Sequence, residues 1–183
     1  SRIARVNKYQ IEFILKFVPS GNLLEIGPSF GTFALQAKNA GFKVDAIEMD
    51  TRCCEFLSKS VGINAVNSNC PEQAINNLEK HDVIALWHNI EHLPNPWGFL
   101  REAAKNLNPG GILLIAAPNP DSFGFRMLKS MWPHVDAPRH LNLITVQLLT
   151  NFLNPVALEL VMMTTKDKGT RSWNRFSWQR FLM

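Results

Sequence analysis

Two acidic residues and a glycine loop between them form the pattern with the clearest chemistry in this sequence. An apolar run that contains Glu25 leads into the loop G-P-S-F-G, which begins at Gly27 and ends at Gly31. Glycine has no Cβ, so this loop can adopt conformations that other residues disfavour and can lie against a ligand. A second apolar run ends in Glu48, seventeen residues after Gly31. An acid at that position can bind the hydroxyls of a ribose, so the pattern predicts a nucleoside-type cofactor.

The middle residue of the loop separates two classes of such cofactors. Dinucleotides carry a pyrophosphate and favour G-x-G-x-x-G, because the second glycine admits phosphate to a helix N-terminus. The loop here has Ser29 in that place, which makes a poorer phosphate cradle. It suits a cofactor that carries an amino-acid group on its ribose, which indicates S-adenosylmethionine. A nicotinamide-dependent dehydrogenase remains the alternative among enzymes.

Three further segments carry a resemblance to a known family. They are HDVIALWHNIEHLPNP at 81–96, LNPGGILLIAAPN at 107–119 and APRHL at 137–141. With the glycine loop, they resemble the class I S-adenosylmethionine-dependent methyltransferases over residues 10–165. The last segment is similar to a small-molecule branch near the quinone O-methyltransferases. The resemblance implies an α/β fold, a Rossmann-like three-layer αβα sandwich around a mostly parallel sheet.

The resemblance also implies which residues bind the cofactor. Glu25 would lie near the methionyl amino group, and Glu48 would bind the ribose hydroxyls. Met49 would pack on the adenine, and Asn69 would face the edge of the adenine. The remaining positions that would line or border the donor are Gly27, Ser29, Gly31, Trp87 and His88.

Each of these assignments has a purely structural alternative. Glu25 could be a carboxylate that orders its own loop. Met49 and Trp87 could belong to the hydrophobic core. Asn69 could simply terminate its strand. For Glu48 a structural duty is harder to name, because an acid that ends a parallel strand after a glycine loop has few such duties.

A possible metal site follows the fourth expected strand. His88, Glu91 and His92 have the i, i+3, i+4 spacing that brings side chains to one face of a helical turn and can bind a divalent ion. The related quinone O-methyltransferases carry E-x-x-E-H here, whereas this chain has His88 in place of the first acid. That change disfavours a hard metal ion. We therefore expect Glu91 and His92 to cap and orient the turn by hydrogen bonds, and we expect no metal.

The acceptor side of the site is expected over residues 121–143, which are rich in aromatic, Met and His side chains. We expect this segment to cover the pocket where α/β sheets bind ligands. Within it, His140 is the candidate general base for a hydroxyl acceptor. The alternative is a hydrogen-bond pair between His140 and Arg139 that joins two loops.

Composition agrees with one domain over residues 1–183, with a cofactor-binding core at 20–119. The chain is 46% hydrophobic and has no run that approaches the roughly 20 apolar residues of a membrane span. Its three cysteines make no plausible disulfide framework, so we expect a soluble, cytoplasmic protein. The net charge of +4 is a modest surplus, and we expect no nucleic-acid partner.

Strands and helices alternate along the chain, which predicts a parallel sheet covered on both faces. A seventh strand is not evident: either the chain is truncated, or the aromatic segment 166–183 replaces that strand as a helix. This tail would touch a membrane surface or pack in the core. The other expected elements are helices at 2–17 and 32–40, a helix capped by Thr51, a strand at 63–66, a helix capped by Asn95 and closed by Gly110, a helix capped by Thr145, and a sixth strand at 157–164.

The sequence therefore predicts methyl transfer from S-adenosylmethionine to a small-molecule acceptor, at oxygen. The sulfonium of the donor is already activated, so the protein needs mainly to align the donor and acceptor and to remove a proton. A methyltransferase-like scaffold that binds the cofactor without catalysis is the alternative outside the enzymes.

Overall fold

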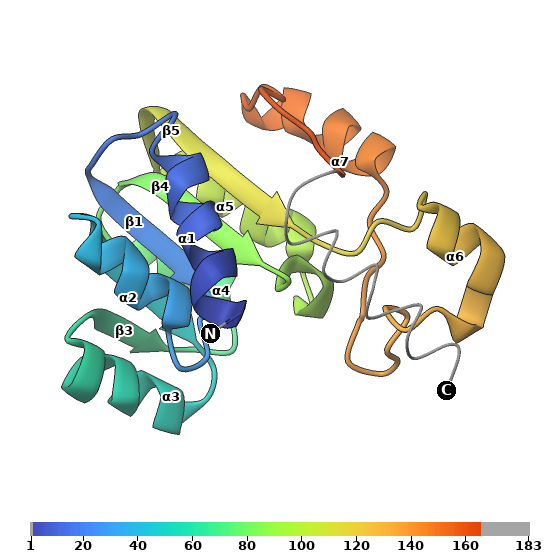
Figure 1. Cartoon of the computed structure of the whole chain (residues 1–183). Coiled ribbons are helices and arrows are strands. Elements are labelled where there is room, and N and C mark those ends of the chain that lie inside the picture. Colours follow the sequence, from blue (N-terminus) through green and yellow to red (C-terminus); the bar gives the residue numbers. More distant parts are fainter. Residues whose placement is uncertain (1, 166–183) are drawn as a thin grey trace. The chain divides into compact units, whose positions relative to one another are not determined.

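The computed structural model describes residues 2–165 of the chain. They form two compact units. The first unit contains the residues up to 89 and residues 95–116, and the second contains residues 90–94 and the residues from 117 onward. Most of the core expected at 20–119 lies in the first unit, where a parallel sheet is sandwiched between helices (Figure 1).

The sheet has five strands in the order β3-β2-β1-β4-β5, and all four neighbouring pairs are parallel. The chain builds β1 to β3 towards one edge and then returns to place β4 and β5 on the other side of β1. In such sheets, ligands bind where the strand order reverses, at the carboxyl ends of the strands. The observed α/β fold confirms the expected class. The strands are β1 (Asn22–Ile26), β2 (Lys43–Glu48), β3 (Asn64–Asn67), β4 (His81–Trp87) and β5 (Leu107–Ala116).

The register of the strands brings Glu25 and Glu48 to the same end of the sheet, at the carboxyl ends of the strands. Glu25 lies opposite Ala46 of β2 and Ala85 of β4. Since β2 continues to Glu48 and β4 continues to Trp87, the carboxyl ends of these three strands meet at the loop that follows β1.

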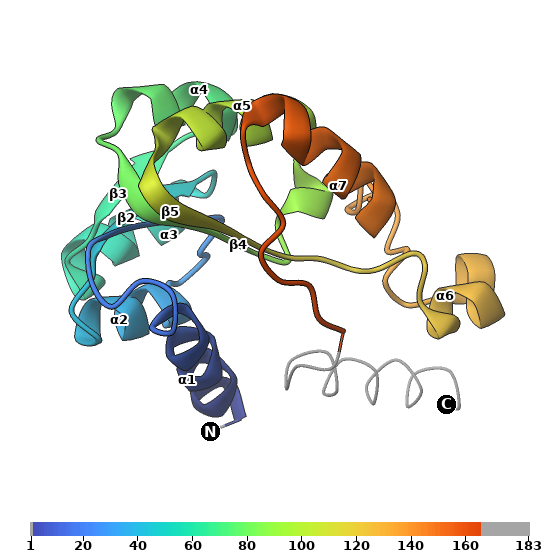
Figure 2. The same ribbon diagram turned by 90° about the horizontal axis from the view of Figure 1, so that it is seen from above.

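Helices cover both faces of the sheet (Figure 2). On one face, α1 (Arg2–Ile14) and α2 (Thr32–Asn39) contribute Ile14 and Phe33 to the core with Leu23 and Val83. Each such buried side chain contributes about 1.5–3 kcal/mol of transfer free energy. The other face carries α4 (Pro71–Ala74) and α5 (Pro96–Asn106). Helix α3 (Thr51–Phe56) leads into a π-helical turn at Leu57–Val61, which packs in the same core cluster as Ile14 and Phe33.

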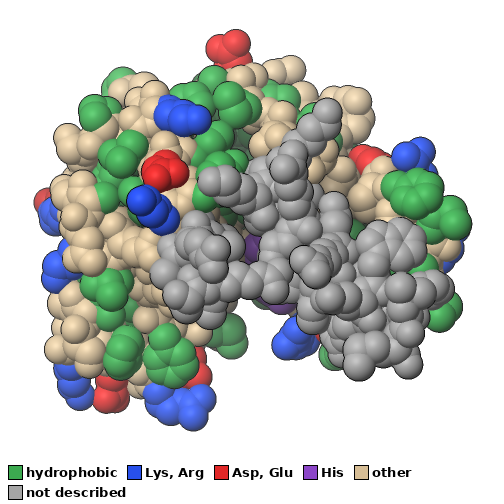
Figure 3. Space-filling view, viewed as in Figure 1, with side chains coloured by type: hydrophobic (Ala, Val, Ile, Leu, Met, Phe, Trp, Pro, Cys, Tyr) green, Lys and Arg blue, Asp and Glu red, His purple; other side chains and the backbone are tan. Residues whose placement is uncertain are grey.

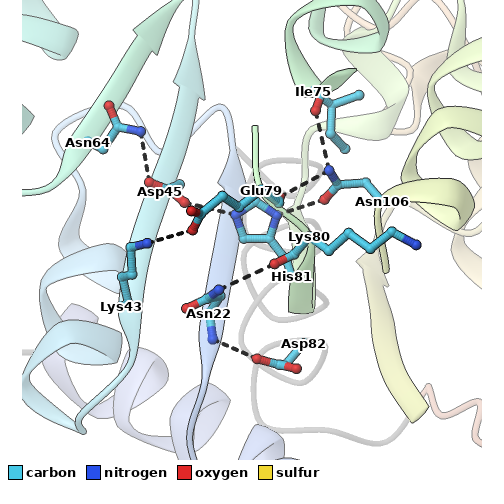
Figure 4. Close-up of polar contacts among 10 residues, drawn as sticks. All are labelled: Asn22, Lys43, Asp45, Asn64, Ile75, Glu79, Lys80, His81, Asp82 and Asn106. Carbon is cyan, nitrogen blue, oxygen red and sulfur yellow. Dashed lines mark hydrogen bonds and ion pairs between the residues drawn. The ribbon is translucent and has the colours of Figure 1, made fainter. Parts of the chain in front are cut away.

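A buried polar network joins β2, β4 and α5 near the amino end of β4 (Figure 4). The ring of His81 is fully buried, with Nε2 at 2.9 Å from Asp45 Oδ2 and Nδ1 at 2.7 Å from Asn106 Oδ1. The Asn106 amide donates to the Glu79 carbonyl, which fixes its orientation. Burial alone would raise the pKa of Asp45, but hydrogen bonds from His81 and Asn64 outweigh it and lower the pKa. This network holds β2, β4 and α5 together at the end of the sheet away from the glycine loop.

The expected helix caps are confirmed at two positions and wrong at one. Asn95 accepts a hydrogen bond from the Gly98 N–H at the start of α5, and Thr145 caps α7 (Val146–Leu153). At α3, however, Asp50 is the cap, because its carboxylate accepts from the backbone of the first turn and Thr51 is already helical. An adjacent carboxylate is a better cap than a threonine hydroxyl.

Several element boundaries also differ from expectation. The first helix ends at Ile14 and continues as a turn, and the third strand is shifted by one residue to Asn64–Asn67. Gly110 does not close the helix before it: α5 ends at Asn106, and Gly110 lies inside β5 with φ +79°.

The second unit contains less regular structure. The segment expected to lack periodicity forms α6 (Phe123–Leu128) and a 3-10 turn at Lys129–Met131, and α7 follows. The sixth strand expected at 157–164 is wrong: residues 158–164 have no regular structure, and most of them are exposed. Their mostly apolar side chains are compatible with a strand, but no backbone ladder within 2–165 pairs with them, and a strand needs that partner. The helix expected at 166–183 lies outside the described residues. No helix among residues 2–165 is long and apolar enough to span a membrane.

Candidate cofactor site

The loop after β1 requires its glycines. Gly27 and Gly31 have φ values of +62° and +70°, in the left-handed region that side chains disfavour. A Cβ on Gly27 would lie 1.9 Å from the amide nitrogen of Asn89, and one on Gly31 would lie 2.2 Å from Leu57 Cδ2. Ser29 also has a positive φ, of 52°. The loop therefore has a backbone conformation, and a close packing against Asn89 and Leu57, that other residues at these glycines would not permit.

Glu48 orders this loop. Its Oε2 accepts a hydrogen bond from the Ser29 backbone N–H over 2.8 Å, and its Oε1 accepts from the Asp50 N–H over 2.9 Å. The side chain is buried. We suggested loop ordering as the structural alternative for Glu25. In the structure, Glu48 makes the hydrogen bonds that order the loop. Each carboxylate oxygen has two lone pairs, so these bonds leave capacity for ligand hydroxyls.

Glu25 is buried deeper at the same edge. It is 4% exposed, and burial raises its pKa to about 8. The charge of Glu48 acts in the same direction, whereas a hydrogen bond from the Ala34 backbone opposes it. Its Oε2 has no hydrogen-bond partner among the residues described. A buried oxygen of this kind is costly unless a ligand supplies a donor.

The surface next to Glu48 is apolar. Met49 is 73% exposed, so the alternative that placed it in the core is wrong. Phe30 is 60% exposed and packs edge to face on Phe56, with ring centroids 5.5 Å apart. These side chains provide a nonpolar surface suited to an aromatic base. Asn69 is exposed and follows the end of β3.

Two asparagines of the site were missed in the sequence. The Asn67 amide donates to the backbone carbonyls of Glu48 and Met49, each over 3.0 Å, and so holds the turn that carries both residues. The Asn89 amide lies directly over Gly27. The only signal was an amide at or just past the end of a strand.

Trp87 and His88 end the fourth strand. The Trp87 ring packs edge to face on Phe33 with centroids 5.3 Å apart, so it contacts the core as its alternative proposed. His88 is exposed, has φ 53°, and its backbone N–H donates to the Ala116 carbonyl over 2.8 Å.

In the second unit, Glu91 and His92 lie with His140 rather than His88. One potential ligand atom of each residue lies within 4.8 Å of the others. The Glu91 carbonyl accepts from the Leu141 N–H over 2.8 Å, and the Nδ1 of His92 lies 2.9 Å from the Arg139 carbonyl. These bonds fix the segment around His140 to the Glu91 turn. The Glu91 bond is made by its backbone carbonyl, so a capping role for the Glu91 side chain stays a prediction.

His140 and Arg139 do not pair through their side chains. Arg139 pairs with the Asp136 carboxylate. The Nδ1 of His140 lies 2.7 Å from the His134 carbonyl, and the side chain is 9% exposed. A ring that donates from Nδ1 keeps the lone pair of Nε2 when neutral.

The fold and this edge define an α/β domain built to bind a nucleoside-type cofactor. A family model described as "Methyltransferase domain" matches residues 2–161, and the chain belongs to this methyltransferase family. The class I methyltransferase resemblance and its cofactor, S-adenosylmethionine, are thereby confirmed at the level of the family.

Individual relatives agree with this assignment. The chain is 25% identical over 127 residues to a ubiquinone biosynthesis O-methyltransferase of Rickettsia bellii, covering 63% of this chain and 52% of that protein. A protein of the same name from Hydrogenovibrio crunogenus is 24% identical over 122 residues, covering 63% and 51%. The chain thus spans about half the length of the curated relatives it matches.

Solved structures share the fold. A SAM-dependent methyltransferase from Archaeoglobus fulgidus superposes with a TM-score of 0.69 and 18% identity, covering 97% of this chain and 86% of that one. An O-methyltransferase family protein from Burkholderia thailandensis gives 0.64 and 12% identity, covering 86% and 52%.

Proposed function

We propose that this protein transfers a methyl group from S-adenosylmethionine to the oxygen of a small molecule. The observation that carries the proposal is the glycine cradle held by Glu48 at the carboxyl ends of β1 and β2. A Cβ at either glycine would collide with a neighbouring side chain, and a buried carboxyl of Glu25 stands beside the loop. Both features fit a cofactor that joins a ribose to a charged amino-acid group.

The residues of the first unit would bind and orient the donor. Glu48 would accept the ribose hydroxyls with its remaining lone pairs, and the backbone at Gly27 and Gly31 would lie against the ligand. Met49 and Asn69 would contact the adenine. When bound, the donor supplies a methyl group on a positively charged sulfur, so alignment provides much of the rate.

His140 would act on the acceptor. Its Nδ1 faces the His134 carbonyl, which selects the tautomer with a free lone pair on Nε2. That atom would take the proton of a hydroxyl as the methyl group moves. The names of the relatives support oxygen as the methylated atom and a small molecule as the acceptor.

We propose neither a metal ion nor a nucleic-acid partner for this reaction. The Glu91 carbonyl and the His92 ring both bind the backbone of the segment around His140, which supports a structural role for this turn. Outside the grey area, the Lys and Arg side chains on the face shown in Figure 3 are scattered and mixed with acidic ones, and they form no basic patch there of the kind that binds nucleic acid. A cytoplasmic location is part of the same proposal.

The test is turnover of S-adenosylmethionine with a panel of hydroxylated aromatic acceptors, followed by mass spectrometry of the products. Methylated product at oxygen, undiminished by a chelator, is the expected result. Tight binding of S-adenosylhomocysteine without methylation of any acceptor would favour the scaffold alternative.

A further inference from the structure

The second unit places a carboxylate next to the candidate base. The Oδ2 atom of Asp136 lies 4.0 Å from Nε2 of His140. The other ring nitrogen, Nδ1, lies 2.7 Å from the His134 carbonyl, which can only accept a hydrogen bond. Nδ1 therefore carries the proton of the neutral ring, and the lone pair stays on Nε2, the nitrogen near the carboxylate.

The backbone holds these two residues in one turn. The Asp136 carbonyl accepts from the Arg139 N–H over 2.9 Å and from the His140 N–H over 3.2 Å. Asp136 has a φ of 34°, a value that few residues other than glycine adopt. Such positions cluster at functional sites, where the surrounding structure maintains them.

Arg139 fixes the direction of the carboxylate. Its Nε lies 3.0 Å from Asp136 Oδ2, and its Nη2 binds the same oxygen. The hydrogen bond from Arg139 lowers the pKa of the Asp136 carboxyl, although burial opposes it, and the charges of Arg139, His140 and His92 also lower it. Asp136 is therefore a carboxylate at neutral pH. The Arg139 side chain is 74% exposed, so water screens its charge and it offsets only part of the effect of the carboxylate on the ring.

Two more titratable groups of the second unit lie near this ring, both on the Glu91 turn. A carboxylate oxygen of Glu91 and a ring nitrogen of His92 lie within 4.8 Å of a ring nitrogen of His140. The His92 ring also packs edge to face on His140, with centroids 4.8 Å apart. Glu91 is thus a second carboxylate that could act on His140, and the experiment has to separate it from Asp136.

The proposed reaction moves a positive charge onto the His140 ring. When a methyl group passes from sulfur to the acceptor oxygen, a carbon–sulfur bond breaks and a carbon–oxygen bond forms. The O–H bond of the acceptor also breaks, and its proton goes to Nε2. The positive charge therefore leaves the sulfur and ends on the imidazole. An opposite charge at the 4.0 Å of Asp136 favours the charged form of the ring.

We propose that Asp136 is the positioning residue of His140: its backbone holds the ring in the turn, and its carboxylate stabilises the imidazolium that forms as the acceptor loses its proton. This inference rests on the proposed function and adds to it a residue whose charge controls the proton step. A carboxylate that only supports the turn through Arg139 would not change how the rate depends on pH.

The experiment measures kcat for methyl transfer to one hydroxylated aromatic acceptor from about pH 5 to about pH 9, in the unaltered protein and in Asp136→Asn. Asparagine tolerates a positive φ as aspartate does, so the variant removes the charge and keeps the turn. The acid limb of the profile should move to lower pH by about half to one unit, because an imidazolium without the carboxylate loses its proton more readily. On the plateau, kcat should fall about three- to tenfold, while KM for S-adenosylmethionine stays unchanged.

Further variants control for charge and for folding. Glu159→Gln removes one negative charge from an exposed side chain of the same unit and should change neither kcat nor the acid limb. Asp136→Glu keeps the charge and should restore the acid limb of the unaltered protein. Asp136→Gly removes the charge with a residue suited to the positive φ, and should move the limb as Asp136→Asn does, so the test holds if one of the two does not fold.

The outcomes separate the inference from the proposed function. If Asp136→Asn and Asp136→Gly lose activity but keep the acid limb, Asp136 only supports the turn, and the inference fails while the proposed function survives. If Glu91→Gln moves the limb and the Asp136 variants do not, the inference fails in the same way. If the unaltered protein methylates no acceptor, or if His140→Gln keeps full activity, the proposed function or its base fails and the inference fails with it.

Discussion

The carboxylate of Glu48 accepts a hydrogen bond from the Ser29 backbone N–H over 2.8 Å and so joins the end of β2 to the loop after β1. Its second oxygen accepts from the Asp50 N–H at the start of the next helix. One buried side chain thus sets the shape of the loop and stands where a ribose is expected.

We predict that Glu48→Ala weakens binding of S-adenosylmethionine and S-adenosylhomocysteine by about 1.5–3 kcal/mol. The replacement removes a charged acceptor and releases the Ser29 N–H. Titration calorimetry of both proteins measures the difference. Equal affinities would exclude Glu48 from the site.

Gly27→Ala should destabilise the protein and abolish cofactor binding. The backbone at this position has a positive φ, which alanine disfavours, and the added Cβ would lie 1.9 Å from the amide nitrogen of Asn89. Gly110→Ala is the matched control: its φ is +79°, and nothing lies within 4 Å of its Cβ position. The control carries the backbone strain alone, about 1–2 kcal/mol. Thermal unfolding and calorimetry of both variants separate strain from steric conflict. If Gly27→Ala loses no more stability and cofactor affinity than Gly110→Ala, Asn89 does not occupy the space next to Gly27.

Glu25→Gln should stabilise the ligand-free protein at alkaline pH. Because folding raises the pKa of Glu25 from 4.5 to about 8, the folded state binds its proton more tightly than the unfolded state. The stability that this proton contributes is complete below pH 4.5 and is lost as pH rises to 8, by about 4 kcal/mol at most. The variant lacks this loss. Urea unfolding at pH 5 and pH 8 checks it, and parallel pH profiles for the two proteins would contradict it.

His140→Gln should lower the rate of methyl transfer about a hundredfold and leave S-adenosylhomocysteine binding unchanged. The rate falls because the proposed base is lost. Binding is unchanged because the residues proposed to bind the donor belong to the other unit. His134→Gln is a control for local disturbance, since the bond from His140 goes to the backbone carbonyl of His134, which the substitution keeps. A His140 variant with full activity on a hydroxyl acceptor would remove the base assignment.

The candidate site residues that could be predicted from the sequence are those that follow a local pattern. Glu25, the glycines and Glu48 stand at strand ends, and strand ends are legible from short apolar runs. The position of Asn89 and the hydrogen bond from the Ser29 N–H to Glu48 could not be predicted, because they depend on which strands pair and in which register. The false strand at 157–164 has the same origin: its residue types are compatible with a strand, but only tertiary pairing makes one.

The central claim is tested most directly by the ligand that the protein binds. Calorimetry should show that S-adenosylhomocysteine binds the purified chain in a one-to-one complex and that NADH does not bind, because Ser29 replaces the glycine that a pyrophosphate requires. The Glu48→Ala variant, assayed alongside, should bind S-adenosylhomocysteine more weakly. Binding of NADH in preference to S-adenosylhomocysteine would contradict the account.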